Sequence, residues 1–211
     1  MDDLIDRLAS DLQPVPPGAL GRLLFCVLVP GLVLSAALIM IGHGFRPDLA
    51  AAIYLPAFWV KSIYPIALSV IGMTALMVVA RPGGRPRRAG IASLAIYLVL
   101  AALGLWQLRA ASAENYPTLI FGISAWFCPF IIVAAALPVF GAIIVFLRRS
   151  APTNLRLAGG IAGLVAGSVG AWTYSWGCTE NGLAFVALWY TLGIVLCGML
   201  GAALSRLLLR W

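Results

Sequence analysis

The stretch GISAWFCPFIIVAAALPVFGAIIVFL at residues 122–147 contains no charged side chain, and it decides the fold class. A helix that spans a membrane needs about 20 consecutive apolar residues, and this run is long enough. Five further runs of this kind lie at residues 23–41, 62–80, 91–108, 157–174 and 183–204. The sequence therefore predicts an all-α polytopic membrane protein, a bundle of six transmembrane helices.

The composition supports this class. Apolar residues make up 63% of the chain and charged residues only 10%, and the mean hydropathy is +1.03. A soluble domain carries about 25% charged residues, so little of this chain can form one. The net charge of +7 comes from arginines that lie between the apolar runs. Membrane topology explains such arginines, and we expect no direct contact with nucleic acid.

The basic residues also predict which way the helices face. If the six runs alternate in direction, three basic residues lie on one side: Arg46, Lys61 and Arg109. The other side carries Arg7, Arg22, Arg81, Arg85, Arg87, Arg88, Arg148, Arg149, Arg156, Arg206 and Arg210. Short loops rich in arginine stay in the cytoplasm, so both termini are expected there. Lys61 is expected to extend outward, with aromatic residues such as Tyr174 at the outer membrane interface.

The chain begins with MDDLIDRLASDLQPVPPG, which is not apolar enough to enter a membrane. Its leucines recur at helical spacing between acidic residues, and prolines end the pattern at residue 14. We predict a short amphipathic cytoplasmic helix over residues 2–13. Residues 1–18 then form this helix and a proline-rich linker, and residues 19–211 form the membrane domain. The acidic start is unlike a signal peptide.

Small and cyclic residues suggest how the helices pack. Gly159, Gly163 and Gly167 recur every four residues, a spacing that lets helix backbones approach closely in a membrane. We interpret this stripe as packing within the bundle, with a homodimer as the alternative. Pro129 and Pro138 are expected to kink the fourth span.

Two of the four cysteines are expected in the outer half of the protein. Cys128 is predicted about two turns inside the fourth span, and Cys178 lies in the loop before the sixth. The pair could form a disulfide or bind a soft metal ion, with Glu180 and His43 as accessory ligands and Met40 nearby. Packing is the alternative for each of them. Glu180 and Asn181 could instead stabilise the start of the next helix, with Asn181 as its cap. Cys26 and Cys197 are interpreted as packing residues.

Signals of catalysis and transport are weak. The span interiors carry no Asp or Glu, C-x-x-C and phosphate-binding glycine motifs are absent, and His43 is the only histidine. We therefore expect no enzyme and no resident cofactor. A small metal or solute transporter, a membrane thiol-redox protein and a structural subunit remain alternatives at this stage.

Four stretches of the chain carry a resemblance to a known family. They are LIDRLASDLQPV at 4–15, FWVKSIYP at 58–65, RPG at 81–83 and WTYSWGCTENGLAFVALWYTLG at 172–193. In these stretches the chain resembles the NrsF family of six-span anti-sigma factors of the bacterial inner membrane. The resemblance covers almost the whole chain, and its last motif is the most distinctive.

The resemblance implies a function that composition alone does not. Proteins of this family hold an extracytoplasmic-function (ECF) sigma factor at the membrane and release it under heavy-metal or oxidative stress. Two cysteines on the outer side are implicated in sensing, and here they would be Cys128 and Cys178. The N-terminal motif is the natural sigma-binding segment, and helix-in-groove binding would suit it. Its candidate contacts are Leu4, Ile5, Leu8, Asp11, Leu12 and Val15.

Overall fold

The computed structural model describes residues 18–150 and 152–209, and throughout these residues the regular structure is helical. Six helical segments are long and apolar enough to cross a membrane. They are α2 (Ala19–Gly42), α4 (Pro56–Val79), α5 (Arg87–Ala110), α7 (Cys128–Arg148), α8 (Leu155–Ser175) and a continuous segment over Leu183–Leu208. The six-span prediction is confirmed. The expected N-terminal helix and the positions assigned to sigma binding lie outside the described residues.

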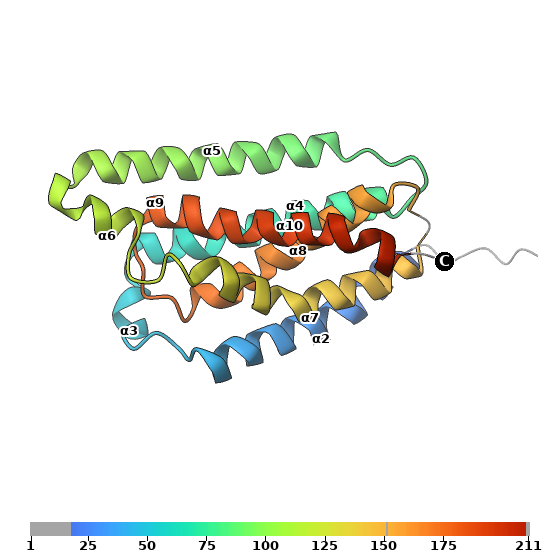
Figure 1. Ribbon diagram of the computed structural model, residues 1–211, viewed down its shortest axis with the longest axis horizontal. Coiled ribbons are helices and arrows are strands. Elements are labelled where there is room, and N and C mark those ends of the chain that lie inside the picture. Colours follow the sequence, from blue (N-terminus) through green and yellow to red (C-terminus); the bar gives the residue numbers. More distant parts are fainter. Residues whose placement is uncertain (1–17, 151, 210–211) are drawn as a thin grey trace, which may run out of the picture.

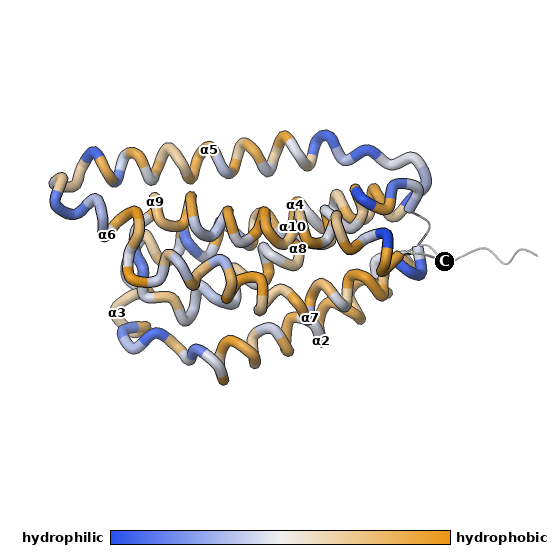
Figure 2. Tube along the Cα trace, in the orientation of Figure 1, coloured by the Kyte–Doolittle hydropathy of each residue, from blue (hydrophilic) through white to orange (hydrophobic). Residues whose placement is uncertain are grey.

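Short segments connect the long helices at both ends of the bundle (Figure 1). At one end lie α3 (Leu49–Ala52), a 3-10 turn (Ala113–Asn115), α6 (Tyr116–Ile120) and the loop at residues 176–182. We call this the Cys178 end. At the other, the arginine end, lie the loops at 80–86 and 149–154 and the start of α2. Figure 2 shows apolar residues along the helices and hydrophilic residues gathered toward the two ends.

Helix α8 is the centre of the bundle. It contacts α10 (Thr191–Leu208), α7, α4 and α2, and about two-thirds (67%) of its most apolar window is buried. In α5 the buried share is 11%. The apolar core forms two clusters, one toward each end of the bundle. Both the core and the lipid-facing surface of such a bundle are apolar. Close packing around α8 is therefore what distinguishes the inside of this protein from its surface.

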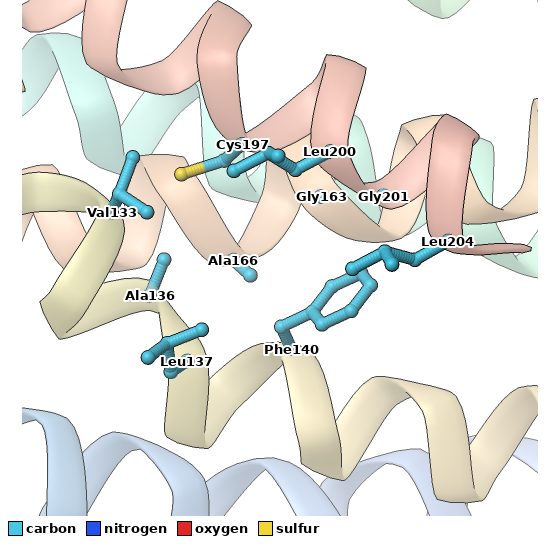
Figure 3. Close-up of a pocket in the computed structure, with 10 residues that line it drawn as sticks. All are labelled: Val133, Ala136, Leu137, Phe140, Gly163, Ala166, Cys197, Leu200, Gly201 and Leu204. Carbon is cyan, nitrogen blue, oxygen red and sulfur yellow. The ribbon is translucent and has the colours of Figure 1, made fainter. Parts of the chain in front are cut away.

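Gly159, Gly163 and Gly167 of α8 lie at its contact with α10. A Cβ atom added to Gly163 would overlap the carbonyl oxygen of Cys197, and one added to Gly159 would overlap that of Gly201. Only glycine permits this approach of two backbones. Figure 3 shows the apolar surroundings of this contact, where Cys197 lines a small cavity of about 60 Å³ between α7, α8 and α10. The packing interpretation is confirmed for the stripe and for Cys197.

Two predicted helix starts are wrong by six residues. Helix α4 begins at Pro56 rather than residue 62, and α7 begins at Cys128 rather than residue 122. Residues 121–127 form turns, so Cys128 is the first residue of α7 and does not lie two turns deep. Pro129 lies in the first turn of α7, where its missing N–H leaves no bond unmade, so it starts the helix and does not kink it.

The last membrane segment contains a π-helical turn that the sequence did not predict. Val186–Tyr190 form this turn between α9 (Leu183–Phe185) and α10. Such turns insert one extra residue into an α-helix and occur often at functional sites. Tyr190, the last residue of this turn, is fully buried.

We predict that Gly163→Leu strongly destabilises the protein, because the new side chain would overlap the backbone of α10. Overpacking lowers the free energy of unfolding by about 1–3 kcal/mol where neighbouring side chains can move aside. Here the neighbour is backbone, so we expect a larger loss. The measurement is the midpoint of thermal unfolding of the full chain in detergent. Gly141→Leu is the matched control, since a Cβ on Gly141 meets nothing within 4 Å. Equal midpoints for the two variants would contradict this account of the α8–α10 contact.

Candidate functional site

The structure brings together the two cysteines that the sequence assigned to the outer side. Cys128 starts α7, Cys178 lies in the loop at 176–182, and both side chains are buried within the same cluster. Their exposed fractions are 0% and 1%, and neither forms a disulfide. Cys26 is exposed on α2, so its interpretation as a packing residue is wrong, and Cys197 lies on α10; neither belongs to this site. The candidate site is therefore a pair of buried thiols at the Cys178 end.

Lys61 holds the backbone of the Cys178 loop. Its Nζ donates hydrogen bonds to the carbonyl oxygens of Cys178, at 2.7 Å, and Glu180, at 2.8 Å. Lys61 is only 1% exposed, and no carboxylate in the described part of the chain forms an ion pair with it. The expectation that Lys61 extends outward is wrong. Buried carbonyl groups need donors, and the loop obtains two of them from this ammonium group.

Arg46 holds the same loop from the segment between α2 and α3. Its guanidinium group binds both carboxylate oxygens of Asp48, at 2.8 and 2.7 Å, and donates to Asn181 Oδ1 at 3.3 Å. Its backbone N–H donates to the carbonyl oxygen of Trp176 at 3.2 Å. The hydrogen bond from Arg46 keeps the pKa of Asp48 below its usual value. The ion pair therefore persists at neutral pH and is lost only as acid protonates Asp48 below that usual value.

Glu180 connects the Cys178 loop to the turn that precedes Cys128. Its Oε1 accepts hydrogen bonds from the backbone N–H of Ile123, at 2.8 Å, and from Ser124 Oγ, at 3.3 Å. The carboxylate lies against Gly122, whose φ of +53° favours glycine and where a Cβ atom would overlap it. A single carboxylate thus fixes the relative position of the two segments that carry the cysteines.

The other predicted accessory ligand, His43, lies beside the Cys178 loop, where a Cβ atom added to Gly177 would be 2.8 Å from its ring carbon Cδ2. His43 is exposed at the end of α2, with its ring 5.3 Å from that of Tyr174. Within residues 18–150 and 152–209, no three His, Cys, Asp or Glu side chains lie close enough to hold one metal ion. A soft metal bound here would therefore rely mainly on the two cysteines, which are the ligands such metals prefer.

Gln107 performs the capping role that the sequence assigned to Asn181. Gln107 Oε1 accepts a hydrogen bond from the backbone N–H of Leu183 at 2.7 Å, and its Nε2 donates to the Asn181 carbonyl at 3.3 Å. The side chain of Asn181 is instead bound by Arg46. The cap comes from α5, so the prediction for Asn181 is wrong. No local sequence pattern indicates a cap that lies 76 residues away.

Two tyrosines complete the surroundings of the thiols. Tyr174 and Tyr190 are both fully buried beside Cys178, with ring centroids 5.7 Å apart. Neither hydroxyl group has a hydrogen-bond partner within the described residues. Tyr174 was expected at the membrane interface, and its burial corrects that. A buried hydroxyl without a partner costs about 1–3 kcal/mol, so the site retains unsatisfied polar groups next to its thiols.

The arrangement can couple thiol chemistry to helix position. The Cys178 loop is bound by Lys61 of α4, by Arg46 after α2 and by Gln107 of α5, and Glu180 links it to the turn before α7. A new bond at Cys178 Sγ would displace a backbone that these side chains hold. Helices α4 and α5 therefore contact this loop directly, and the segments that adjoin α2 and α7 contact it as well.

Comparison with known proteins agrees with the resemblance in the motifs. The family model described as NrsF, negative regulator of sigma F, matches residues 8–211. The anti-sigma-F factor NrsF of Caulobacter vibrioides is 38% identical over 217 residues, covering 100% of this chain and 99% of its own. The probable anti-sigma-F factor NrsF of Azospira oryzae is 33% identical over 219 residues, with the same coverage. No solved structure matches the chain. With a family model and two relatives matching over nearly its full length, the chain belongs to the NrsF family of negative regulators of sigma F.

Proposed function

We propose that this protein is an anti-sigma factor of the bacterial inner membrane that binds an ECF sigma factor and releases it under metal or oxidative stress. The observation that carries the proposal is the full-length similarity to two proteins named as anti-sigma-F factors. The buried thiol pair supports the sensing part, because its loop is bound by side chains from several membrane helices.

The sigma factor would bind at the arginine end. The described chain begins there at Gly18, so the preceding residues join the bundle beside the loops at 80–86 and 149–154. In this proposal the arginine end faces the cytoplasm, in keeping with its excess of arginines. The N-terminal stripe would enter an apolar groove of the sigma factor, and each leucine that is fully buried contributes about 1.5–3 kcal/mol.

The signal would act at the opposite end. In the oxidative version, Cys128 and Cys178 form a disulfide and give two electrons and two protons to the oxidant. In the metal version, both thiols lose protons and bind a soft cation. Either product changes the position of Cys178 relative to α7, and the loop contacts pass this change to α4 and α5. A homodimer would need a surface other than the glycine stripe, which α10 covers within the chain.

We expect Leu4, Ile5, Leu8 and Leu12 changed together to serine to abolish sigma-factor capture. Losing four apolar anchors should weaken binding by more than about tenfold, because each tenfold corresponds to about 1.4 kcal/mol. The measurement is co-purification of soluble proteins with the full chain in detergent, followed by their identification. Ala9→Ser with Gln13→Ser, which lie off the stripe, is the control and should capture normally. Capture of no sigma factor by the unchanged chain would overturn the proposal.

We expect Cys128→Ser and Cys178→Ser, singly, to retain capture but to prevent release under stress. Each variant removes one thiol that a disulfide or a two-thiolate metal site requires. A sigma-dependent reporter, followed during exposure to cadmium or peroxide, measures the release. Cys26→Ser is the control, since this exposed cysteine lies outside the site. Normal induction in both site variants would show that the thiol pair is not the sensor.

We expect Lys61→Met to make Cys178 accessible. Methionine has a similar length but donates no hydrogen bond, so the carbonyls of Cys178 and Glu180 lose their common donor. The rate of maleimide labelling of Cys178, with the other cysteines changed to serine, should rise by about tenfold if the loop opens more easily by about 1.4 kcal/mol. Arg109→Met removes an exposed cation at the same end and is the control. Unchanged labelling would show that Lys61 does not hold the loop.

A further inference from the structure

Helix α5 stands apart from the bundle along much of its length. Its buried residues are Leu100 and Gly104, both in the half nearer the Cys178 end. There, a Cβ atom on Gly104 would lie 3.0 Å from the backbone nitrogen of Ala184, and Gln107 caps α9. Toward the arginine end, α5 borders an open groove, and Figure 1 shows it as the outermost helix on its side. The helix is thus attached at one end and flanked by a hollow at the other.

The groove is large, apolar and lies at membrane depth. It has a volume of about 620 Å³, within the range of about 300–1,000 Å³ found for ligand sites. Side chains from α4, α5, α8 and α10 line it, among them Leu68, Leu94, Leu164 and Val195. A space with such walls is unfavourable for water, and in a membrane a hydrocarbon chain is the natural occupant.

The mouth of the groove is basic. Arg85 and Arg87 line it at the arginine end, and an adjoining hollow of about 370 Å³ shares both of them and adds Thr74 and Arg88. None of these three arginines forms a hydrogen bond or ion pair with another described residue. The first turn of α5 also begins here, and the free N–H groups of a helix start favour an anion. An apolar groove therefore opens into a hollow lined by three arginines, which have no side-chain partner among the described residues.

A second groove lacks the combination of apolar walls and a basic mouth. It has about 480 Å³ between α2, α4, α7 and α8, with Phe25, Leu32 and Val139 in its lining. No charged residue lines it. Ordinary bilayer lipid can cover such a surface without any preference for its headgroup. The groove beside α5 differs because its apolar and basic parts are continuous.

We propose that the groove beside α5 binds an anionic phospholipid. One acyl chain lies between α5 and the helices α4, α8 and α10, and the phosphate headgroup lies in the hollow at Arg85, Arg87 and Arg88. Basic sites between membrane helices bind anionic headgroups in this way. The bound lipid fills the space between α5 and the bundle and stabilises that half of α5.

Lipid binding to the full chain, measured by native mass spectrometry, tests the proposal. The probes are phosphatidylglycerol and the zwitterionic phosphatidylethanolamine with the same acyl chains. We expect phosphatidylglycerol to bind about tenfold more tightly, and Arg85, Arg87 and Arg88 changed together to glutamine to remove this preference. Arg81, Arg149 and Arg156 changed to glutamine form the matched control, with the same loss of charge at the same end. Equal binding of the two lipids, or equal loss in both triple variants, would overturn the proposal.

A separate variant tests whether an acyl chain occupies the groove. Gly90 lines the groove, and a Cβ atom there meets nothing within 4 Å, so Gly90→Phe can fill the groove without displacing backbone. We expect this variant to unfold at a normal temperature but to bind phosphatidylglycerol about tenfold more weakly. Gly141→Phe, also without a neighbour within 4 Å, should bind normally. Normal binding by Gly90→Phe would show that lipid does not occupy this groove.

Discussion

The close approach of α8 to α10 is the contact on which the other helix positions depend. Gly159, Gly163 and Gly201 bring carbonyl oxygens of one helix against Cα atoms of the other, so their backbones, not their side chains, determine the spacing. Helices in a membrane gain little from burying apolar side chains, because lipid is equally apolar. Close van der Waals contact is the gain that remains. With α10 held so near, α8 presents its other faces to α4 and α7, and these in turn carry α5 and α2.

A second constraint acts at the Cys178 end, where the chain is irregular. Backbone groups outside regular helices must find partners inside the protein when water is scarce. Here the partners are long polar side chains that are distant in sequence: Lys61 of α4, Gln107 of α5 and Arg46 of the segment between α2 and α3. Each binds the backbone of the segment 176–183, so exchangeable hydrogen bonds hold the loop, together with close contacts of Gly177 and Gly182 with the backbones of Gly44 and Leu119. Such a loop can be stable and still be shifted by a new bond at one of its sulfur atoms.

The sequence predicted the features that depend on local pattern. Apolar runs identified six spans, the spacing of Gly159, Gly163 and Gly167 identified a packing surface, and alternating topology placed Cys128 and Cys178 at one end. The predictions that were wrong concern polar groups with distant partners. Lys61, directly before the run at 62–80, was expected to extend outward. No local pattern indicated its burial, because the carbonyls that it binds are more than 110 residues away in sequence. Gln107 was not singled out for the same reason. The π-helical turn at 186–190 lacks a sequence signal, because its residues suit an α-helix equally well.

Helices α8 and α5 differ in how deeply they are buried, and this difference affects how a signal would travel. Helix α8 is buried over about 67% of its most apolar window and α5 over only 11%, so a displacement of α8 would disturb far more contacts. Both helices meet the Cys178 loop, α8 by leading directly into it and α5 through Gln107. Packed helices move between discrete arrangements, and the least buried element offers the least resistance. Because α5 extends from this loop to the arginines at the opposite end, it is the helix best placed to carry a change in the thiols across the membrane.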